Sequence, residues 1–247
     1  MAQTTFHWDS CAITNVGKVR KINEDAVLDN NEASLWVVAD GMGGHAAGDV
    51  ASSSIVNALR EIRPSEDLPA LITEVEEVIL AVNRDLIRQA NERVDRQTMG
   101  STIAALLAHG DHCFCLWAGD SRVYRLRGDE FKRITVDHSK VQDLVDEGII
   151  DEEDAESHPE ANVITRAVGA NDELFVDMDI FDVKDGDIYL VCSDGLFKEL
   201  RESEIAEIMA GKPPEQSGQE LVDLTLDRGS RDNVTVIVIH AHANKPS

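Results

Sequence analysis

Residues 35–45 read Leu-Trp-Val-Val-Ala-Asp-Gly-Met-Gly-Gly-His, so that an apolar run leads directly into a cluster of glycines. The run at 35–39 has the length and composition of a buried strand. We expect this strand to end at Asp40, because three glycines within residues 41–44 favour a tight backbone path. A helix is expected to follow from about residue 49 to 62, before Pro64.

The rest of the chain alternates between strand-like and helix-like patterns. Aliphatic residues recur at three- and four-residue steps between 68 and 87, which predicts a long amphipathic helix. Shorter helices are predicted over about 202–209 and 219–228, with a loop at 211–218 between them. Runs rich in β-formers predict strands at 102–108, 113–117, 122–126, 174–181, 188–192 and 234–240. One domain spanning residues 1–247, with sheets covered by helices, fits this pattern best.

Residues 140–168 have no clear apolar periodicity. A long segment of this kind is typical of a surface flap rather than of a core. We expect this flap to move and to influence the choice of substrate.

The composition excludes several classes of protein. Of the 247 residues, 43% are hydrophobic, which excludes wholesale disorder. The formal net charge is −24, and such a surface repels nucleic acid and anionic lipid. We therefore expect no nucleic-acid or membrane partner. No signal peptide and no apolar run of about 18 residues is visible, and the expected location is the cytoplasm.

Three aspartates share one setting, at the end of an apolar strand with a glycine nearby: Asp40, Asp194 and Asp232. Mg²⁺ and Mn²⁺ prefer carboxylate, carbonyl and water oxygens, which strand ends flanked by glycine can supply. Taken alone, an Asp-Gly pair is also an ordinary turn signal. The metal interpretation gains weight from Arg20 and the pair Glu24-Asp25, because a guanidinium can hold a phosphate through two parallel hydrogen bonds.

Together these motifs resemble the protein phosphatase 2C (PPM) family of metal-dependent protein phosphatases, in a form similar to stand-alone bacterial catalytic domains. The matching segments lie in the order typical of the family, at residues 17–25, 40–44, 100–102, 119–122, 137–139, 193–196 and 231–235. The resemblance implies an α+β fold, a four-layer α/β/β/α sandwich in which two antiparallel sheets pack face to face with helices outside.

The resemblance also implies a centre of two Mn²⁺ or Mg²⁺ ions, with a third ion in some bacterial members. Asp40, Asp194 and Asp232 would surround one ion. Asp40 would bridge to the second, joined by the carbonyl of Gly41 and, through water, by Glu24. Asp120 resembles a ligand of the third ion, although a role as a turn residue is equally compatible with the sequence. Asp25 and Asn233 would support the ligands by hydrogen bonding.

By the same resemblance, a water activated between two ions attacks phosphorus, and Arg20 holds the phosphoryl oxygens. Many relatives carry a histidine directly after Asp-Gly as the proposed general acid, but Met42 stands there in this chain. His45 is either a substitute acid or a loop residue with no catalytic role.

The expected activity is hydrolysis of phosphoserine and phosphothreonine on proteins, with a cognate Ser/Thr kinase as a functional partner. Three alternatives stay open at this point. They are a different two-metal hydrolase, a catalytically weak phosphoprotein-binding pseudo-phosphatase, and a structural cation-binding protein.

Overall fold

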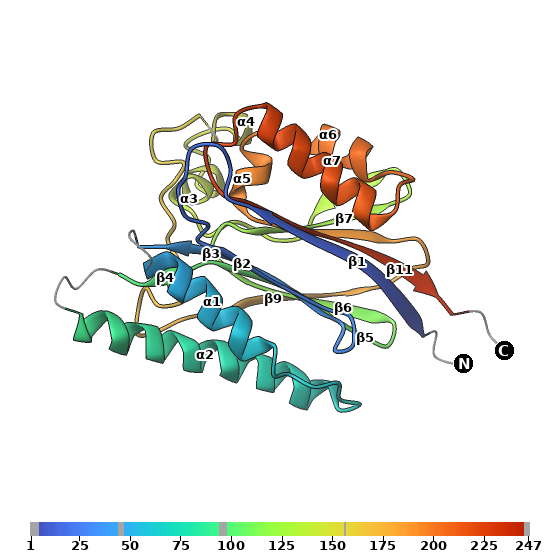
Figure 1. Cartoon of the computed structure of the whole chain (residues 1–247), viewed down its shortest axis with the longest axis horizontal. Coiled ribbons are helices and arrows are strands. Elements are labelled where there is room, and N and C mark those ends of the chain that lie inside the picture. Colours follow the sequence, from blue (N-terminus) through green and yellow to red (C-terminus); the bar gives the residue numbers. More distant parts are fainter. Residues whose placement is uncertain (1–4, 44–46, 94–97, 156, 245–247) are drawn as a thin grey trace.

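The computed structural model describes residues 5–43, 47–93, 98–155 and 157–244. Two antiparallel sheets pack against each other, and helices cover both outer faces (Figure 1). This arrangement confirms the four-layer sandwich expected from the resemblance.

The first sheet has the strand order β1-β11-β10-β7-β8. Its strands are β1 (Phe6–Asn15), β11 (Val234–Ala243), β10 (Ile188–Cys192), β7 (Arg122–Arg127) and β8 (Glu130–Arg133). The outer face is covered by α5 (Asp194–Phe197), α6 (Glu202–Met209) and α7 (Pro214–Asp227).

The second sheet has the order β2-β3-β5-β6-β9, with a short strand β4 beside β3. Its strands are β2 (Asp25–Asn30), β3 (Leu35–Met42), β4 (Gly100–Ser101), β5 (Ile103–His109), β6 (His112–Ala118) and β9 (Asp177–Asp182). The outer face is covered by α1 (Ala47–Leu59) and α2 (Leu68–Glu92).

Strand β3 shows why the run at 35–39 is apolar at every position. Leu35 and Val37 pack beneath α1 and α2, whereas Trp36 and Val38 point into the layer between the two sheets. Since successive side chains of a strand point to opposite faces, a strand buried on both faces needs an unbroken apolar run.

The strand continues past the predicted end at Asp40. Gly41 and Met42 pair with Ser101 and Gly100 of β4, which keeps the backbone extended. Asp40 therefore lies within a paired strand instead of in a loose turn.

Several predicted boundaries are wrong, and four strands were not predicted. Helix α7 begins at Pro214, so most of the predicted loop at 211–218 is helical. The cause is that proline at the first helical position costs no hydrogen bond. Strand β9 begins at Asp177, later than the predicted residue 174. The strands without a prediction are β1, β2, β4 and β8.

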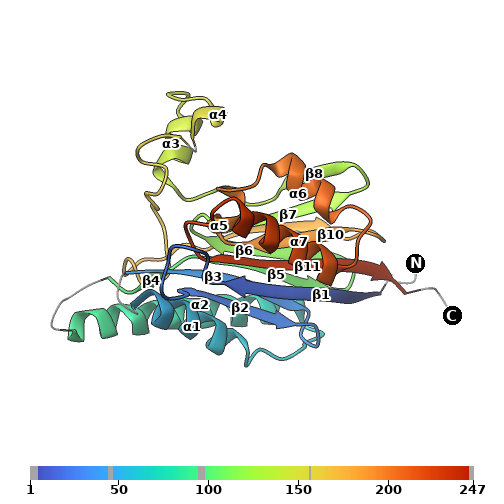
Figure 2. The ribbon, with the colours of Figure 1, turned by 45° about the horizontal axis from the view of Figure 1, so that its top comes forward.

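The segment 140–168 carries two short helices, α3 (Lys140–Asp146) and α4 (Glu152–Ala155). Figure 2 shows these helices projecting away from the four layers. Two isolated bridges close the base of the projection, Ser139 with Ile164 and Ser101 with Val168. Among the described helices, none combines the length and the apolar character that crossing a bilayer requires.

Candidate metal centre and active site

The predicted carboxylates come together at one end of the two sheets. Asp25 of β2 lies opposite Asp40 of β3 in the strand register. Asp194 begins α5, directly after β10, and Asp232 precedes β11. Asp120 follows β6 and is also close enough to interact electrostatically with Asp40.

Three of these aspartates and the adjacent Glu24 carry a buried oxygen without a hydrogen-bond partner in the described part of the chain. The atoms are Glu24 Oε1, Asp25 Oδ1, Asp120 Oδ1 and Asp194 Oδ1. A buried carboxylate oxygen without a donor is costly, and most polar atoms in protein interiors are paired. Unpaired oxygens on four neighbouring carboxylates are the arrangement that hard divalent cations require. The donor set therefore fits Mn²⁺ or Mg²⁺.

The crowding of these acids changes their protonation. Burial and the neighbouring carboxylates raise the pKa of Asp40 well above its ordinary value. Burial, together with Asp194 and Asp232, raises the pKa of Asp25 to about 7. Burial and the adjacent Asp194 raise the pKa of Asp120 to about 7 as well. Without a cation, the cluster thus holds protons to reduce its own repulsion.

Hydrogen bonds hold the remaining oxygen of Asp25 in place. Asp25 Oδ2 accepts from Ser193 Oγ at 2.8 Å and from Thr235 Oγ1 at 2.7 Å. The backbone N–H of Thr235 donates to Ser193 Oγ at 3.0 Å. These bonds tie Asp25 to β10 and β11 in the opposite sheet and leave Oδ1 directed away from them.

Asn233 connects the loop before β2 to the start of β11. Its Oδ1 accepts from the backbone N–H of Glu24 at 2.8 Å. Its Nδ2 donates to the carbonyl oxygens of Val16 at 2.9 Å and Ile22 at 3.1 Å. One amide side chain therefore fixes the loop that carries both Arg20 and Glu24.

The glycines of β3 and α1 allow a very close contact beside Glu24. A Cβ added to Gly48 would lie 2.6 Å from Glu24 Oε1 and 2.7 Å from the carbonyl carbon of Gly41. No side chain fits there, so helix α1 packs directly on the backbone of β3. This contact sets the position of the Gly41 carbonyl relative to Glu24.

Arg20 lies at the rim of the cluster. Its Nη2 donates to Asp232 Oδ2 at 2.7 Å, and its side chain is 48% exposed. The guanidinium is thus oriented by a candidate metal ligand while remaining accessible to an incoming anion.

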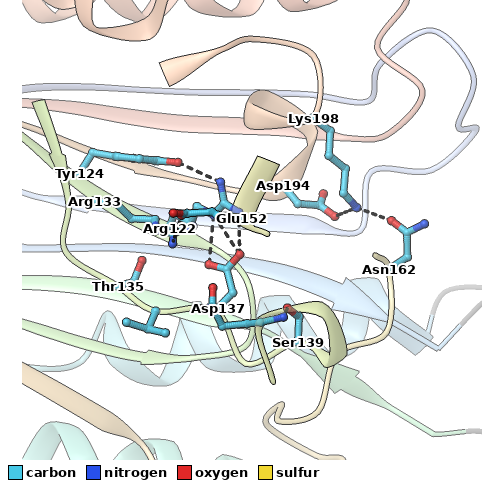
Figure 3. A network of polar contacts seen from close by, with 12 residues as sticks. Arg122, Tyr124, Arg133, Thr135, Asp137, Ser139, Glu152, Asn162, Asp194 and Lys198 are labelled. Atoms are coloured by element: carbon cyan, nitrogen blue, oxygen red, sulfur yellow. Dashed lines mark hydrogen bonds and ion pairs between the residues drawn. The ribbon is translucent and has the colours of Figure 1, made fainter. Parts of the chain in front are cut away.

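Lys198 is a site residue that we did not predict from the sequence. Its Nζ donates to Asp194 Oδ2 and, at 2.6 Å, to Asn162 Oδ1 of the projecting segment (Figure 3). It also interacts electrostatically with Asp120. The sequence feature that could have identified Lys198 is its spacing of four residues from Asp194, because side chains four residues apart on a helix lie next to each other.

A buried ion pair, formed by Arg122 and Asp137, packs against α5. Arg122 Nε and Nη2 donate to the carboxylate of Asp137 at 2.7–3.0 Å (Figure 3). The guanidinium carbon lies 3.6 Å from the ring centre of Phe197. Arg122 Nη1 also donates to Tyr124 Oη at 3.1 Å. This network holds the helix that presents Asp194 and Lys198.

His138 is held by local contacts through both of its ring nitrogens. One His138 ring nitrogen accepts from the Gly119 N–H at 3.1 Å, and the other lies 3.2 Å from Asp177 Oδ2. Both nitrogens are thus engaged in local structure. His45, the predicted alternative acid, lies outside the described residues.

A sequence profile of the protein phosphatase 2C family matches residues 18–224, and the chain belongs to this family. It is 38% identical over 238 residues to the serine/threonine protein phosphatase PstP of Mycobacterium tuberculosis. That match covers 96% of this chain and 46% of PstP, so the chain spans about half the length of this relative.

Two solved structures place the fold in the same family. The structure of PppA, described as a key regulatory component of T6SS in Pseudomonas aeruginosa, is 44% identical, with a TM-score of 0.89. The match covers 96% of this chain and 99% of PppA. The catalytic domain of PstP in complex with two manganese ions is 35% identical with a TM-score of 0.87, covering 96% of this chain and all of that domain.

Proposed function

We propose that this protein is a metal-dependent phosphatase that hydrolyses phosphoserine and phosphothreonine on other proteins. The observation that carries the proposal is the set of buried, unpaired carboxylate oxygens beside the half-exposed Arg20. The family membership and the manganese-bound relative support it.

In this proposal Asp40, Asp194 and Asp232 would hold one Mn²⁺ or Mg²⁺ ion. Asp40, the Gly41 carbonyl and, through water, Glu24 would hold the second. Bound cations of this kind supply Lewis acidity and a water of lowered pKa for attack on phosphorus.

Asp120 is assigned to a third cation. Its buried unpaired Oδ1 and its proximity to Asp194 support this assignment over a role limited to the turn. Lys198 contacts Asp194 and interacts electrostatically with Asp120, so its ammonium would compete with that cation.

The chain's own residues bind and orient the substrate. Arg20 donates to two phosphoryl oxygens and balances the charge that develops on them. Asp232 fixes the direction of the guanidinium, and Asn233 fixes the loop that carries it. His45 is the proposed donor of the proton that the leaving oxygen needs.

The segment 140–168 is proposed to act as a flap on a single domain that spans residues 1–247. Its projection from the layers and its contact with the site through Asn162 and Lys198 support a role in substrate choice. Phosphoproteins and a cognate Ser/Thr kinase in the bacterial cytoplasm are the proposed partners, in a signalling role. Strong hydrogen-exchange protection throughout the segment would count against a mobile flap.

The test is turnover of a phosphothreonine peptide with Mn²⁺, with Mg²⁺ and with EDTA. We compare the wild type with Asp194→Ala and with Asp129→Ala, a control in the exposed turn after β7. Wild type and control should be active only with metal, and Asp194→Ala should be inactive. A wild type that binds cations but never turns over would favour the pseudo-phosphatase.

A further inference from the structure

A second group of metal-ligating side chains lies at the opposite end of β1 and β11. In the antiparallel register His7 lies opposite His242, and Asp9 lies opposite His240. Because alternate residues of a strand share a face, all four side chains are on one face of this pair of strands. Figure 1 shows the two strands ending side by side near the two termini.

This face is the outer one and is separate from the acidic centre. Cys11 and Ile13, on the same face of β1, lie beneath Gly218 of α7. Asp232 precedes β11, and His242 lies near the far end of that strand. At about 3.3 Å per residue, the two sites are on the order of 30 Å apart.

The side chains of His7, Asp9 and His242 already converge. Each offers one ligand atom, and these three atoms all lie within 4.8 Å of one another. His242 Nε2 is 3.3 Å from Asp9 Oδ2. The rings of His7 and His242 are stacked, with centres 4.9 Å apart. His7 and Asp9 are exposed and His242 is partly exposed, so small side-chain rotations would let the three atoms surround one ion.

Asn244 fixes which nitrogen of His7 is free. His7 Nδ1 is 3.1 Å from Asn244 Oδ1, so Nδ1 donates a hydrogen bond to that oxygen. In the neutral ring this leaves the lone pair on Nε2, which can then bind a metal. Asn244 is itself held, since its Nδ2 donates to Thr5 Oγ1 and its backbone N–H to the Thr5 carbonyl, both at 2.9 Å. Metal-binding histidines are usually oriented by a second hydrogen bond of this type.

His240 adds a further imidazole to the same face. Its Nε2 is buried and has no partner among the described residues. Burial and the neighbouring His242 lower the pKa of His240, which keeps the ring uncharged beside the other three groups.

We propose that His7, Asp9 and His242 form a binding site for Zn²⁺ or a similar late transition-metal ion. Two imidazoles and one carboxylate are a ligand set that suits zinc, at about 2.0–2.2 Å from the ion, and the fourth position is open to water. Mg²⁺ and Mn²⁺ prefer oxygen ligands, so the two ends of the molecule select different metals.

Ion binding here ties the first strand of the chain to the last. Strand β1 is an edge strand whose only partner in its sheet is β11, among the described strands. An ion held by both strands is present only in the folded state and stabilises it by mass action. Zn²⁺ should therefore raise the midpoint of thermal unfolding.

The test is equilibrium dialysis against Zn²⁺, with the acidic centre kept in excess Mn²⁺. We compare the wild type with His7→Gln and His242→Gln. The matched control is His112→Gln, because His112 also lies beside two carboxylates and its side chain is 44% exposed, against 39% for His242. Long-range ¹⁵N spectra of the histidine rings report which residues contact the ion.

We expect wild type and His112→Gln to bind one more Zn²⁺ than His7→Gln and His242→Gln. Asn244→Ala should weaken binding at least tenfold without removing it. Asp194→Ala should retain this Zn²⁺, which separates the site from the acidic centre. Equal zinc binding by wild type, His7→Gln and His242→Gln would overturn the proposal, as would an unperturbed His242 signal at saturation.

Discussion

Asp25 illustrates how single residues build the acidic centre. One of its oxygens is fixed by two hydroxyl groups from the opposite sheet, and the other is buried and unpaired. The sequence identifies Asp40, Asp194 and Asp232 as candidate metal ligands, because each lies near a glycine at the end of an apolar strand. It could not identify Ser193, whose role depends on pairing with the distant Asp25, and its only signal for Lys198 was the spacing of four residues from Asp194.

Arg20 should bind the substrate without holding the metal. Arg20→Ala removes charge-assisted hydrogen bonds to the phosphate, so KM should rise roughly 10- to 100-fold. Mn²⁺ stoichiometry by equilibrium dialysis should not change. The KM of Arg20→Lys should lie between those of the wild type and Arg20→Ala, since lysine keeps the charge but loses the planar geometry. Loss of the metal in Arg20→Ala would mean that the residue is structural.

Lys198 should oppose cation binding. Its ammonium occupies Asp194 Oδ2, so Lys198→Ala should lower the Mn²⁺ concentration for half-maximal binding by roughly three- to tenfold. Lys198→Arg keeps the charge and should resemble the wild type. Calorimetric titration with Mn²⁺ measures the change, and weaker binding by Lys198→Ala would contradict this role.

Among elements, the contact of α1 with β3 positions the Gly41 carbonyl. Gly48→Ala places a methyl group into backbone atoms that cannot move aside easily, which should destabilise the fold by about 1–3 kcal/mol and weaken Mn²⁺ binding. Val50→Ala, on the same helix and 39% exposed, is the matched control. Denaturant unfolding with and without Mn²⁺ separates the two effects. Unchanged stability and Mn²⁺ affinity in Gly48→Ala would show that the contact is not needed.

Elements with strong periodicity were predictable, and those shaped by their neighbours were not. The helix α2 and the strand β10 follow directly from their apolar patterns. Strand β2 has only three consecutive apolar residues, at 26–28, between polar ones, and it is an edge strand that is only partly buried. Strand β1 carries polar and charged residues between its apolar ones, so it contains no long apolar run from which a strand could be predicted.

For the whole molecule, the two-sheet packing was expected only through the family resemblance. Strand β1 pairs with β11, near the other end of the chain, and no local pattern specifies such a partner. The convergence of Asp25 with Ser193 and Thr235 depends on that packing. The site was therefore predictable as a set of residues but not as a geometry.

The stability of the whole protein should depend on pH and metal together. Asp25 and Asp120 have ordinary pKa values near 3.8 when unfolded and about 7 when folded, so the folded state binds more protons. The free energy of unfolding without metal should therefore fall as the pH rises from about 4 to about 7. Cations replace those protons, so the stabilisation by Mn²⁺ should grow over the same range.

Thermal unfolding in EDTA and in Mn²⁺, from about pH 5 to about pH 8, measures both trends. Asp120→Asn removes one of the titrating groups and should make the metal-free dependence shallower. A metal-free midpoint that rises with pH would contradict the assignment of raised pKa values to this cluster.

The most direct test of the acidic centre is anomalous diffraction at the manganese edge from crystals grown with Mn²⁺. We predict two strong peaks between Asp40, Asp194, Asp232 and Glu24, one of them touching the Gly41 carbonyl oxygen. Asp194→Ala crystals should lose at least the peak shared by the three aspartates. Peaks that lie only elsewhere, or none at saturating Mn²⁺, would contradict the view that the unpaired carboxylates form a metal centre.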